Sequence, residues 1–438
     1  MQGKALPGFR DFYPEDLSLR NHIFATWRNV ARRYGFEEYD GPPLESLELY
    51  TQKSGDEIVQ QLYAFRDKGD REVALRPEMT PTLARMVAGR GQALKKPIRW
   101  YSIPQLFRYE RQQKGRLREH FQLNMDIIGE ASPLADAELI AASIDIMREL
   151  GFGPKDVKVR VSDREAVVKA LKRHAQIETN EELLGALAAI DRHERDPKGA
   201  LAILEKTLKD KNRVNRAVEF VESLAEPAPS LKNLVRRYWE VDDEGKSHVD
   251  EKLRLDQCIE YLQAMGLAEF VATDFRIVRG LAYYTGIVFE MFDAGSSLRA
   301  ICGGGRYDGL LAAMGGPDLP ALGFGMGDVV LGELLKERGV APKASIELGA
   351  FLIAVGGDDL PWVLKLAHAM RERGIAVEYG LRHTGVRKQL ELAAARGAPR
   401  AVIIGPDERQ AGQAVVRDLK AGTEAKVPFD KLLNGYFD

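Results

Sequence analysis

Basic side chains gather in one short stretch, FRYERQQKGRLREHFQ, which holds Arg108, Arg111, Lys114, Arg116 and Arg118. A charge run of this kind is typical of a solvated hairpin tip. Arg108 differs from the others because it belongs to an apolar, strand-like run, where an unpaired cation is costly. The fork of a buried guanidinium matches a phosphate or a carboxylate. The stretch therefore indicates either a basic surface tip or a site for an anionic ligand.

Carboxylate and amide side chains occur on both sides of this basic stretch. LRPEMTPT places Arg76 and Glu78 at the end of another strand-like run, where the carboxylate could hold an ammonium group or pair with a neighbouring arginine. Gln122, Asn124 and Asp126 alternate with apolar residues, so a regular strand points all three to one face. Such a polar row is poor core material and suits the floor of a polar ligand site.

A third stretch, RGLAYYTGIVFE, begins at Arg279 and contains residue types that favour a buried strand. Strict alternation would put Arg279 and Tyr283 on one face and Tyr284 on the other. If all three meet one ligand, RGLAY must be a loop, and strand pairing begins near Tyr284. The alternative is an ordinary strand end with a solvated arginine and two tyrosines whose hydroxyls point outward.

Two glycine-rich stretches follow, CGGGRYDGL at 302–310 and GFGMGDVVL at 323–331. A G-x-G-x-G pattern is weak evidence for a dinucleotide loop, and no βαβ unit or ribose-binding acid accompanies it. Glycines at alternate strand positions instead predict a flat slot where a ligand approaches the backbone. No metal cluster or nucleophile–base arrangement stands out in the sequence. The expected chemistry is positioning and charge neutralisation in phosphoryl or nucleotidyl transfer.

The composition excludes several classes of protein. Of 438 residues, 45% are hydrophobic and 29% charged, and the net charge is −2, so any RNA contact must come from local basic patches or from RNA-reading elements that do not dominate the net charge. The N-terminus lacks the apolar core of a signal peptide, and no run approaches the ~18 apolar residues of a membrane span. Cys258 and Cys302 form neither a metal-ligand pair nor a disulfide framework. We therefore expect the reducing cytoplasm as the compartment.

The elements before and around the basic stretch predict a mixed fold. Apolar residues recur at helical spacing from Leu19 to Tyr34, and Gly35 is a natural helix stop. Residues 98–110 and 120–129 predict the two strands of a long antiparallel hairpin with a charged tip. Residues 1–162 are therefore expected to form the first part of the core that carries the site.

A helical region interrupts this core. Two capping-box patterns, Ser162 with Glu165 and Thr179 with Glu182, open a stretch without strand signals. We expect an all-helical insertion over 163–262, after which residues 263–340 complete the core. A linker near 336–345 leads to residues 349–438, where strands alternate with helices and predict a small α/β domain.

Taken in order, LRPEMT, FRYERQQKGRLREHFQ, RGLAYYTG, CGGGRYDGL and GFGMG resemble the motifs of the histidyl-tRNA synthetase family of class II aminoacyl-tRNA synthetases. The likeness covers nearly the whole chain, and RGLAYYTG is its most specific part. It implies an α+β fold: an antiparallel six-stranded sheet with flanking helices and a helical insert, followed by an α/β anticodon-binding domain. It also implies a homodimer that converts ATP and L-histidine to histidyl-adenylate and then acylates the 3′ end of tRNA(His).

The resemblance implies a role for each matching residue. Arg108 and Arg279 would be catalytic, both acting on the α-phosphate. The histidine-binding residues would be Glu78, Met79, Thr80, Arg108, Gln122, Asp126, Arg279, Tyr283 and Tyr284, the last two and Asp126 reading the imidazole. The ATP-binding residues would be Arg108, Glu110, Arg116 and Arg306. Mg²⁺ is expected with ATP, held largely through phosphates and water, with no permanently bound cofactor or metal.

The sequence departs from the family pattern at three positions. The third motif usually ends in an arginine that binds ATP, but Val330 stands there. Either another cation, Arg116 or Arg306, covers the γ-phosphate, or ATP binding is weaker. Ala282 replaces a common aspartate, and Asp126 replaces the usual glutamate.

Two other functions remain open at the level of the sequence. One is a non-catalytic paralogue that senses histidine as a regulatory subunit of ATP phosphoribosyltransferase. Such proteins usually lack the C-terminal domain and lose the arginines, whereas this chain has Arg279 and residues 349–438. The other is a related synthetase for another amino acid, which would need a different reader than Tyr283 and Tyr284.

Overall fold

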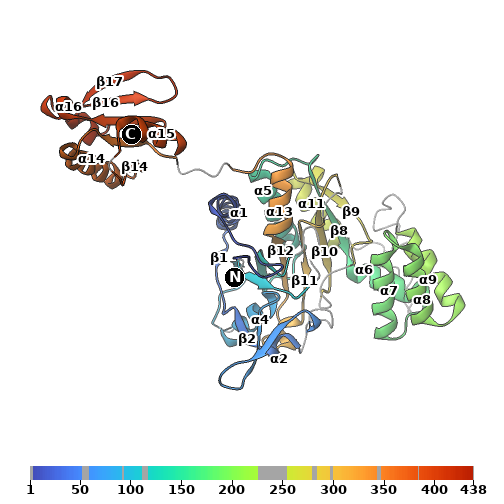
Figure 1. Cartoon of the computed structure of the whole chain (residues 1–438). Helices are drawn as coiled ribbons and strands as arrows, with labels where there is room; N and C mark the ends of the chain where they lie inside the picture. Colours follow the sequence, from blue (N-terminus) through green and yellow to red (C-terminus); the bar gives the residue numbers. More distant parts are fainter. Residues whose placement is uncertain are drawn as a thin grey trace. The chain divides into compact units, whose positions relative to one another are not determined.

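The chain divides into two compact units, Met1–Pro342 and Lys343–Asp438, and both are drawn in Figure 1. The computed structural model describes residues 3–51, 59–90, 93–110, 117–224, 254–278, 284–295, 299–342, 347–382 and 384–437. Each unit has its own sheet and its own cluster of buried apolar side chains. Separate cores are the mark of separate domains.

A large antiparallel sheet forms the centre of the first unit. In spatial order its strands are β5 (Ile98–Ser102), β7 (Glu119–Ile128), β12 (Ala321–Gly327), β11 (Cys302–Arg306), β10 (Ile287–Asp293) and β8 (Val157–Asp163). Every neighbouring pair in this series is antiparallel. Short strands β1 (Glu37–Glu38) and β9 (Val271–Thr273) add parallel partners at the edges, and β6 (Gln105–Phe107) pairs with β7. The expected α+β fold with a six-stranded antiparallel sheet is confirmed.

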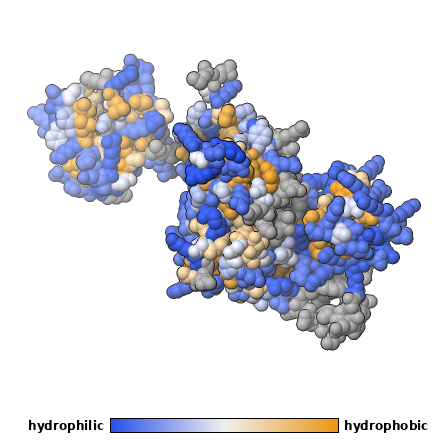
Figure 2. All heavy atoms as spheres, turned by 90° about the horizontal axis from the view of Figure 1, so that it is seen from below, coloured by the Kyte–Doolittle hydropathy of each residue, from blue (hydrophilic) through white to orange (hydrophobic). Residues whose placement is uncertain are grey.

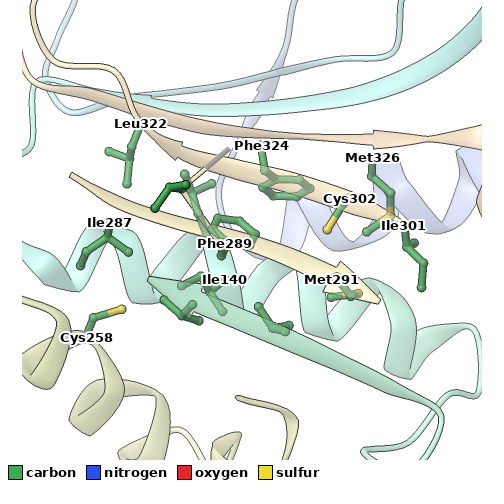
Figure 3. Close-up of a cluster of buried hydrophobic side chains, with 14 of the residues drawn as sticks. Ile140, Cys258, Ile287, Phe289, Met291, Ile301, Cys302, Leu322, Phe324 and Met326 are labelled. Atoms are coloured by element: carbon green, nitrogen blue, oxygen red, sulfur yellow. The ribbon is translucent and has the colours of Figure 1, made fainter. Parts of the chain in front are cut away.

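Helices cover one face of this sheet (Figure 1). They are α1 (Pro14–Arg33), α5 (Pro133–Glu149), α11 (Arg254–Ala264) and α13 (Asp328–Glu337). Helices α1 and α11 pack on α5, and α5 and α13 contact β7 and β12. Figure 3 shows part of the core, where Ile140 of α5 lies close to Phe289, Met291 and other apolar side chains of the strands. Leu123, Met125 and Ile127 of β7 belong to the same core. The alternate, polar residues of β7 therefore face the other side of the sheet.

Smaller elements stand on that other side. They are the three-stranded sheet of β2 (Leu44–Ser46), β4 (Glu72–Leu75) and β3 (Tyr63–Arg66), and the helices α2 (Leu47–Thr51), α4 (Thr80–Arg90) and α12 (Leu310–Ala313). Apolar residues of α4 and α12 cluster with Ile98 of β5 and Ile128 of β7. This packing fixes the junction between β4 and α4, which carries Glu78, against the central sheet.

A group of helices follows β8 along the chain. It consists of α6 (Arg164–Ala175), α7 (Asn180–His193), α8 (Pro197–Leu208) and α9 (Lys211–Ser223), and Figure 2 shows mostly hydrophilic residues on the visible face of its outer helices. Thr179 and Glu182 form the predicted capping box. The other predicted box is wrong, because the ladder between β8 and β10 extends through Ser162 to Asp163. The carboxylate of Asp163 then caps α6 by accepting from the Ala166 amide.

The second unit has a five-stranded sheet in the order β14 (Val377–Tyr379), β13 (Ala350–Ala354), β15 (Arg400–Ile404), β16 (Gln413–Asp418) and β17 (Glu424–Pro428). The first three strands are parallel, and the last two join antiparallel. Helices α14 (Leu360–Glu372) and α15 (Val386–Ala395) connect the parallel strands, and the short α16 (Pro406–Gln410) and α17 (Phe429–Leu433) complete the unit. The sequence pattern missed β17 because Val427 is its one buried residue.

Helices long and apolar enough to span a membrane are absent from the described ranges.

Candidate active site

A cleft of about 600 Å³ lies on the polar face of the central sheet. Its lining includes Glu78 and Thr80 from the start of α4, Arg108 and Glu110 beyond β6, and the alternate β7 residues His120, Gln122, Asn124 and Asp126. Segments from β10, β11 and β12 form the other wall. The sheet thus brings together most of the motifs that the sequence analysis selected.

The floor of the cleft is the predicted polar row of β7. Gln122, Asn124 and Asp126 all line it, opposite Gly327, Gly325 and Gly323 of β12. A methyl group on Gly323 would overlap the carboxylate of Asp126, and one on Gly325 would lie 2.8 Å from Cδ of Gln122. Gly323 and Gly325 therefore make room for the polar side chains of the neighbouring strand β7. The predicted close approach of a ligand to this backbone stays a prediction.

Asp126 is buried to 5% exposure at this floor and has a phenolic partner. The hydroxyl of Tyr307 donates to Oδ1 of Asp126 over 2.6 Å. Burial raises the pKa of Asp126 to about 7, and the bond from Tyr307 opposes that rise. Tyr307 was not predicted as a site residue, although it lies within the CGGGRYDGL stretch. The available signal was that a buried carboxylate needs a donor.

Tyr284 lies in the same part of the cleft. Burial raises the pKa of its phenol, as do the nearby charges of Asp126 and Glu78. Among the described residues, sheet pairing on this segment begins where the Thr285 amide donates to the Arg306 carbonyl over 2.9 Å, before β10 starts at Ile287. The expected start of pairing near Tyr284 agrees with this. Arg279 and Tyr283 lie outside the described residues, so their expected contacts stay predictions.

Glu78 occupies the opposite wall, with 3% of its surface exposed, and Thr80 lies beside it. Arg76, the neighbouring arginine, is held elsewhere: its Nη1 donates to Asp40 over 2.7 Å and to the Gly41 carbonyl over 2.8 Å. Met79 does not reach the cleft, because its side chain is enclosed and its sulfur lies 3.9 Å from Nη1 of Arg76. The expected role of Met79 in histidine binding stays a prediction.

Arg108 and Glu110 line the cleft near His120. Nε of Arg108 donates to the Pro77 carbonyl over 2.9 Å, which ties the guanidinium to the segment that carries Glu78. His120 also faces this region; burial lowers its pKa to about 3, helped by the charges of Arg108 and Arg10, so its ring is neutral at physiological pH. Arg116, the other predicted phosphate ligand of this stretch, lies outside the described residues.

Arg306 does not fit its expected place in ATP binding. Its side chain is 1% exposed and forms an ion pair with Asp136 of α5, with Nη2 to Oδ2 at 2.6 Å. The carbonyls of Glu130 and Ser132 accept two further bonds from it. Arg306 is absent from the cleft lining and instead joins β11 to the start of α5. A phosphate could reach it only by breaking this buried network.

Two exposed arginines complete the lining, Arg195 after α7 and Arg299 before β11. Neither was predicted as a site residue, because neither belongs to a recognised motif. Groups of acidic, histidine or cysteine side chains suited to hold a metal ion are absent from the described parts of the chain. The cleft thus offers arginines at one end and a carboxylate–tyrosine pair at the other, the pattern expected for a ligand with phosphates and a polar ring.

Comparison with known proteins connects this cleft to a family. Residues 8–327 match the family model "Histidyl-tRNA synthetase", and residues 350–435 match "Anticodon binding domain". The chain is 42% identical to the histidine–tRNA ligase of Opitutus terrae, covering 98% of this chain and 97% of the relative. It is 39% identical to the chloroplastic/mitochondrial histidine–tRNA ligase of Arabidopsis thaliana, covering 97% and 85% respectively.

A solved structure shares the fold. The histidyl-tRNA synthetase from Nostoc sp. PCC 7120 superposes with a TM-score of 0.80 at 24% identity, covering 99% of this chain and 98% of that one.

Proposed function

The chain belongs to the histidyl-tRNA synthetase family, and we propose that it is a histidine–tRNA ligase, an aminoacyl-tRNA ligase that uses ATP. The observation that carries this proposal is Asp126, buried at the floor of the cleft with Tyr307 as its donor. Its carboxylate can accept a second hydrogen bond from an imidazole N–H. A site of this kind rejects side chains that lack the N–H by a large factor, since its polar groups would be left unpaired.

We propose that the other residues orient the amino acid and ATP for one displacement. Glu78, Thr80 and Gln122 would hold the α-amino group of histidine, and Tyr284 with Tyr283 would complete the imidazole pocket. Arg108 and Arg279 would neutralise the substrate carboxylate and the α-phosphate. A carboxylate oxygen then forms a bond to the α-phosphorus as the bond to the β-phosphate oxygen breaks, and pyrophosphate leaves with the electron pair. Preorganised cations lower this barrier because charge develops where they already point.

Mg²⁺ belongs to the proposal as a companion of ATP. The cleft carries the carboxylates of Glu110 and Glu290, which suit an ion held mainly by phosphates and water. When bound, the ion would neutralise charge on the triphosphate. Arg116 would contribute to the same end of the nucleotide.

We also propose the domain functions and the assembly. Residues 1–162 and 263–340 would form the catalytic core, 163–262 the helical insertion, and 349–438 the anticodon-binding domain. The match of residues 350–435 to an anticodon-binding model supports the last assignment. A homodimer in the cytoplasm is the arrangement that the family resemblance implies. The anticodon-domain match, together with 42% identity to a ligase over 98% of this chain, favours the enzyme over a regulatory subunit.

Charging of tRNA tests this function. The purified chain is incubated with ATP, Mg²⁺, radiolabelled histidine and tRNA(His), and acid-precipitable label is counted. The proposal expects label on the tRNA, lost when the 3′-terminal adenosine is removed. Lack of charging by a folded chain that still binds histidine would favour the regulatory alternative.

A further inference from the structure

Two buried carboxylates belong to elements that line the cleft, although neither carboxylate lines it. On β7, Glu119 is 1% exposed and immediately precedes His120, which faces the cleft. At the start of α13, Asp328 is 5% exposed and immediately precedes Val329, which also lines the cleft. Neighbouring strand residues point to opposite faces, so the side chain of Glu119 lies on the reverse side of the sheet from the cleft. Ionised groups buried in this way need a compensating charge.

Arg10 is the cation that the two carboxylates share. Its Nε donates to Oε1 of Glu119 over 2.6 Å, and its Nη1 donates to Oδ2 of Asp328 over 2.9 Å. The other two carboxylate oxygens accept from neutral donors, the side-chain amide of Gln105 and the backbone amide of Phe121, both at 2.9 Å. In the described contacts, one positive charge thus serves two negative charges.

The segment that carries Arg10 is fixed to β7 through its backbone. The Gly8 carbonyl accepts from the amides of Arg118 and Glu119 at 3.0 and 3.3 Å. Gly8 has a φ of +87°, and a methyl group there would lie 2.7 Å from Cγ of Arg118. The guanidinium of Arg10 also lies 4.8 Å from the ring centroid of Phe12. The chain on both sides of Arg10 therefore holds it beside the two carboxylates.

This charged group lies near Arg108 and far from the proposed imidazole reader. Burial lowers the pKa of His120, and so do the charges of Arg108 and Arg10, which places both cations near its ring. Arg108 lines the cleft and is the proposed partner of the α-phosphate, whereas Arg10 is absent from the lining. Asp126 lies roughly 20 Å from His120 along β7. Arg10 is therefore close to the proposed phosphate site without reaching it.

Resting on the proposed ligase function, we propose that Arg10 is a positioning residue for ATP, which neutralises Glu119 and Asp328 beneath the site where the phosphates bind. Without Arg10, two buried carboxylates would repel the triphosphate. Such repulsion acts through the protein interior over distances at which water would weaken it, so Arg10 need not touch the nucleotide. Histidine binds at the other end of β7 and carries little net charge, so its affinity should not depend on Arg10.

Calorimetric titration of the full chain and its Arg10→Gln variant with ATP, AMP and adenosine, in the absence of Mg²⁺, tests this. The three ligands share one nucleoside and carry about four, about two and no negative charges. ATP binding should weaken roughly 10-fold and AMP binding roughly threefold, because Coulomb energy is proportional to the charge of the ligand. The affinities for adenosine and histidine should stay within about twofold of wild type.

A rescue variant separates charge from structure. Adding Glu119→Gln and Asp328→Asn to Arg10→Gln removes both negative charges and changes the size of these side chains little. The affinity for ATP should then return to within about threefold of wild type, since no uncompensated carboxylate remains. A structural role of the ion pairs predicts no such recovery.

Arg338→Gln is the matched control. Arg338 also bridges two acids, Asp293 at 2.9 Å and Asp156 at 3.5 Å. It follows the last residue of α13, roughly 15 Å from Asp328 along the helix. This substitution should leave the binding of all three ligands unchanged.

Two results would overturn the proposal. One is unchanged ATP binding in a folded Arg10→Gln chain. The other is an equal loss of ATP, AMP and adenosine binding, which indicates a structural role. If Arg10→Gln does not fold, Glu119→Gln alone replaces it: one negative charge is removed while Arg10 stays, so ATP should bind roughly threefold more tightly. Unchanged or weaker ATP binding in that variant would equally overturn the proposal.

The binding readout separates this inference from the ligase function. If the wild-type chain fails to charge tRNA and Arg10→Gln still loses affinity in proportion to ligand charge, the function is wrong and the role of Arg10 stands. If the chain charges tRNA and its ATP affinity does not depend on Arg10, the function stands and the role of Arg10 is wrong.

Discussion

Asp126 is surrounded by protein, and Tyr307 donates to it at 2.6 Å. Burial raises its pKa to about 7, so near neutral pH the carboxyl is divided between its protonated and ionised forms. An imidazole N–H arriving at the second oxygen would favour the ionised form. Histidine binding and ionisation of Asp126 are therefore coupled.

Replacing Asp126 by asparagine should change how stability depends on pH. The pKa is about 7 in the folded chain and about 4 when unfolded. Between these values the folded state holds a proton that the unfolded state has released, so wild type loses stability as pH rises. Asparagine does not titrate. The melting temperature of Asp126→Asn relative to wild type should thus rise from about pH 5 to pH 7 and then level off.

Thermal melts of both proteins without ligands, over this pH range, measure the effect. A difference that stays constant with pH would show that Asp126 titrates normally in the folded chain. The same variant should lose histidine-dependent adenylate formation by roughly 100-fold or more, as expected when a site's polar reader is altered.

At the scale of elements, β7 and β12 depend on each other. The alternation of polar and apolar residues in β7 was enough to predict that Gln122, Asn124 and Asp126 share a face. It could not identify the strand that lies beside them, because pairing partners far apart in the chain leave no periodic signal. Only the register of β12 explains why glycine occurs at 323 and 325.

Substituting glycines of β12 tests whether the space beside Gly323 matters for histidine binding. Gly323→Ala would push a methyl group into the carboxylate of Asp126. We expect the Michaelis constant for histidine to rise by roughly tenfold or more, since buried groups cannot shift without losing contacts. Gly327→Ala in the same strand is the control, because its added carbon would meet nothing within 4 Å. Equal effects of both variants in steady-state kinetics would argue against the slot.

Arg306 shows where sequence reasoning about a site reached its limit. It follows three glycines in a motif of the family, yet its guanidinium forms an ion pair with Asp136 on α5. Whether an arginine at a strand end faces a cleft or a covering helix depends on the helix packed behind it. Arg299 was not predicted because it lies outside every recognised motif, although it is exposed and lines the cleft. The fold was predictable because its periodicities are local, whereas these side-chain engagements are set by tertiary contacts.

Arg306→Met should therefore act on stability more than on ATP binding. Removing one partner of a buried pair leaves Asp136 uncompensated and typically costs about 3–5 kcal/mol. The double variant Arg306→Met with Asp136→Leu should recover part of that loss. Urea denaturation of wild type, Arg306→Met, Asp136→Leu and the double variant measures the coupling. Normal stability of Arg306→Met together with strongly weakened ATP binding would instead support the expected contact between Arg306 and ATP.

At the scale of the whole molecule, the two units have separate cores and separate sheets. The cleft is formed by the first unit alone. Activation of histidine should then need only that unit, whereas recognition of tRNA should use both. A chain ending at Pro342 should keep histidine-dependent adenylate formation within a few fold of the full chain. Its Michaelis constant for tRNA(His) should rise by roughly 10-fold or more, as expected when one of two linked binding modules is removed.

Parallel assays of adenylate formation and tRNA charging on the two chains check this division. Loss of both activities in a truncated chain that still melts cooperatively would mean that the second unit contributes to the chemistry.

We propose above all that the cleft recognises histidine and activates it with ATP. The most direct test is ATP–pyrophosphate exchange by the full chain, with each of the standard amino acids in turn and the Asp126→Asn variant alongside. We expect exchange with histidine, background rates with the other amino acids, and loss of the histidine signal in the variant. Exchange with a different amino acid, or with none, would contradict it.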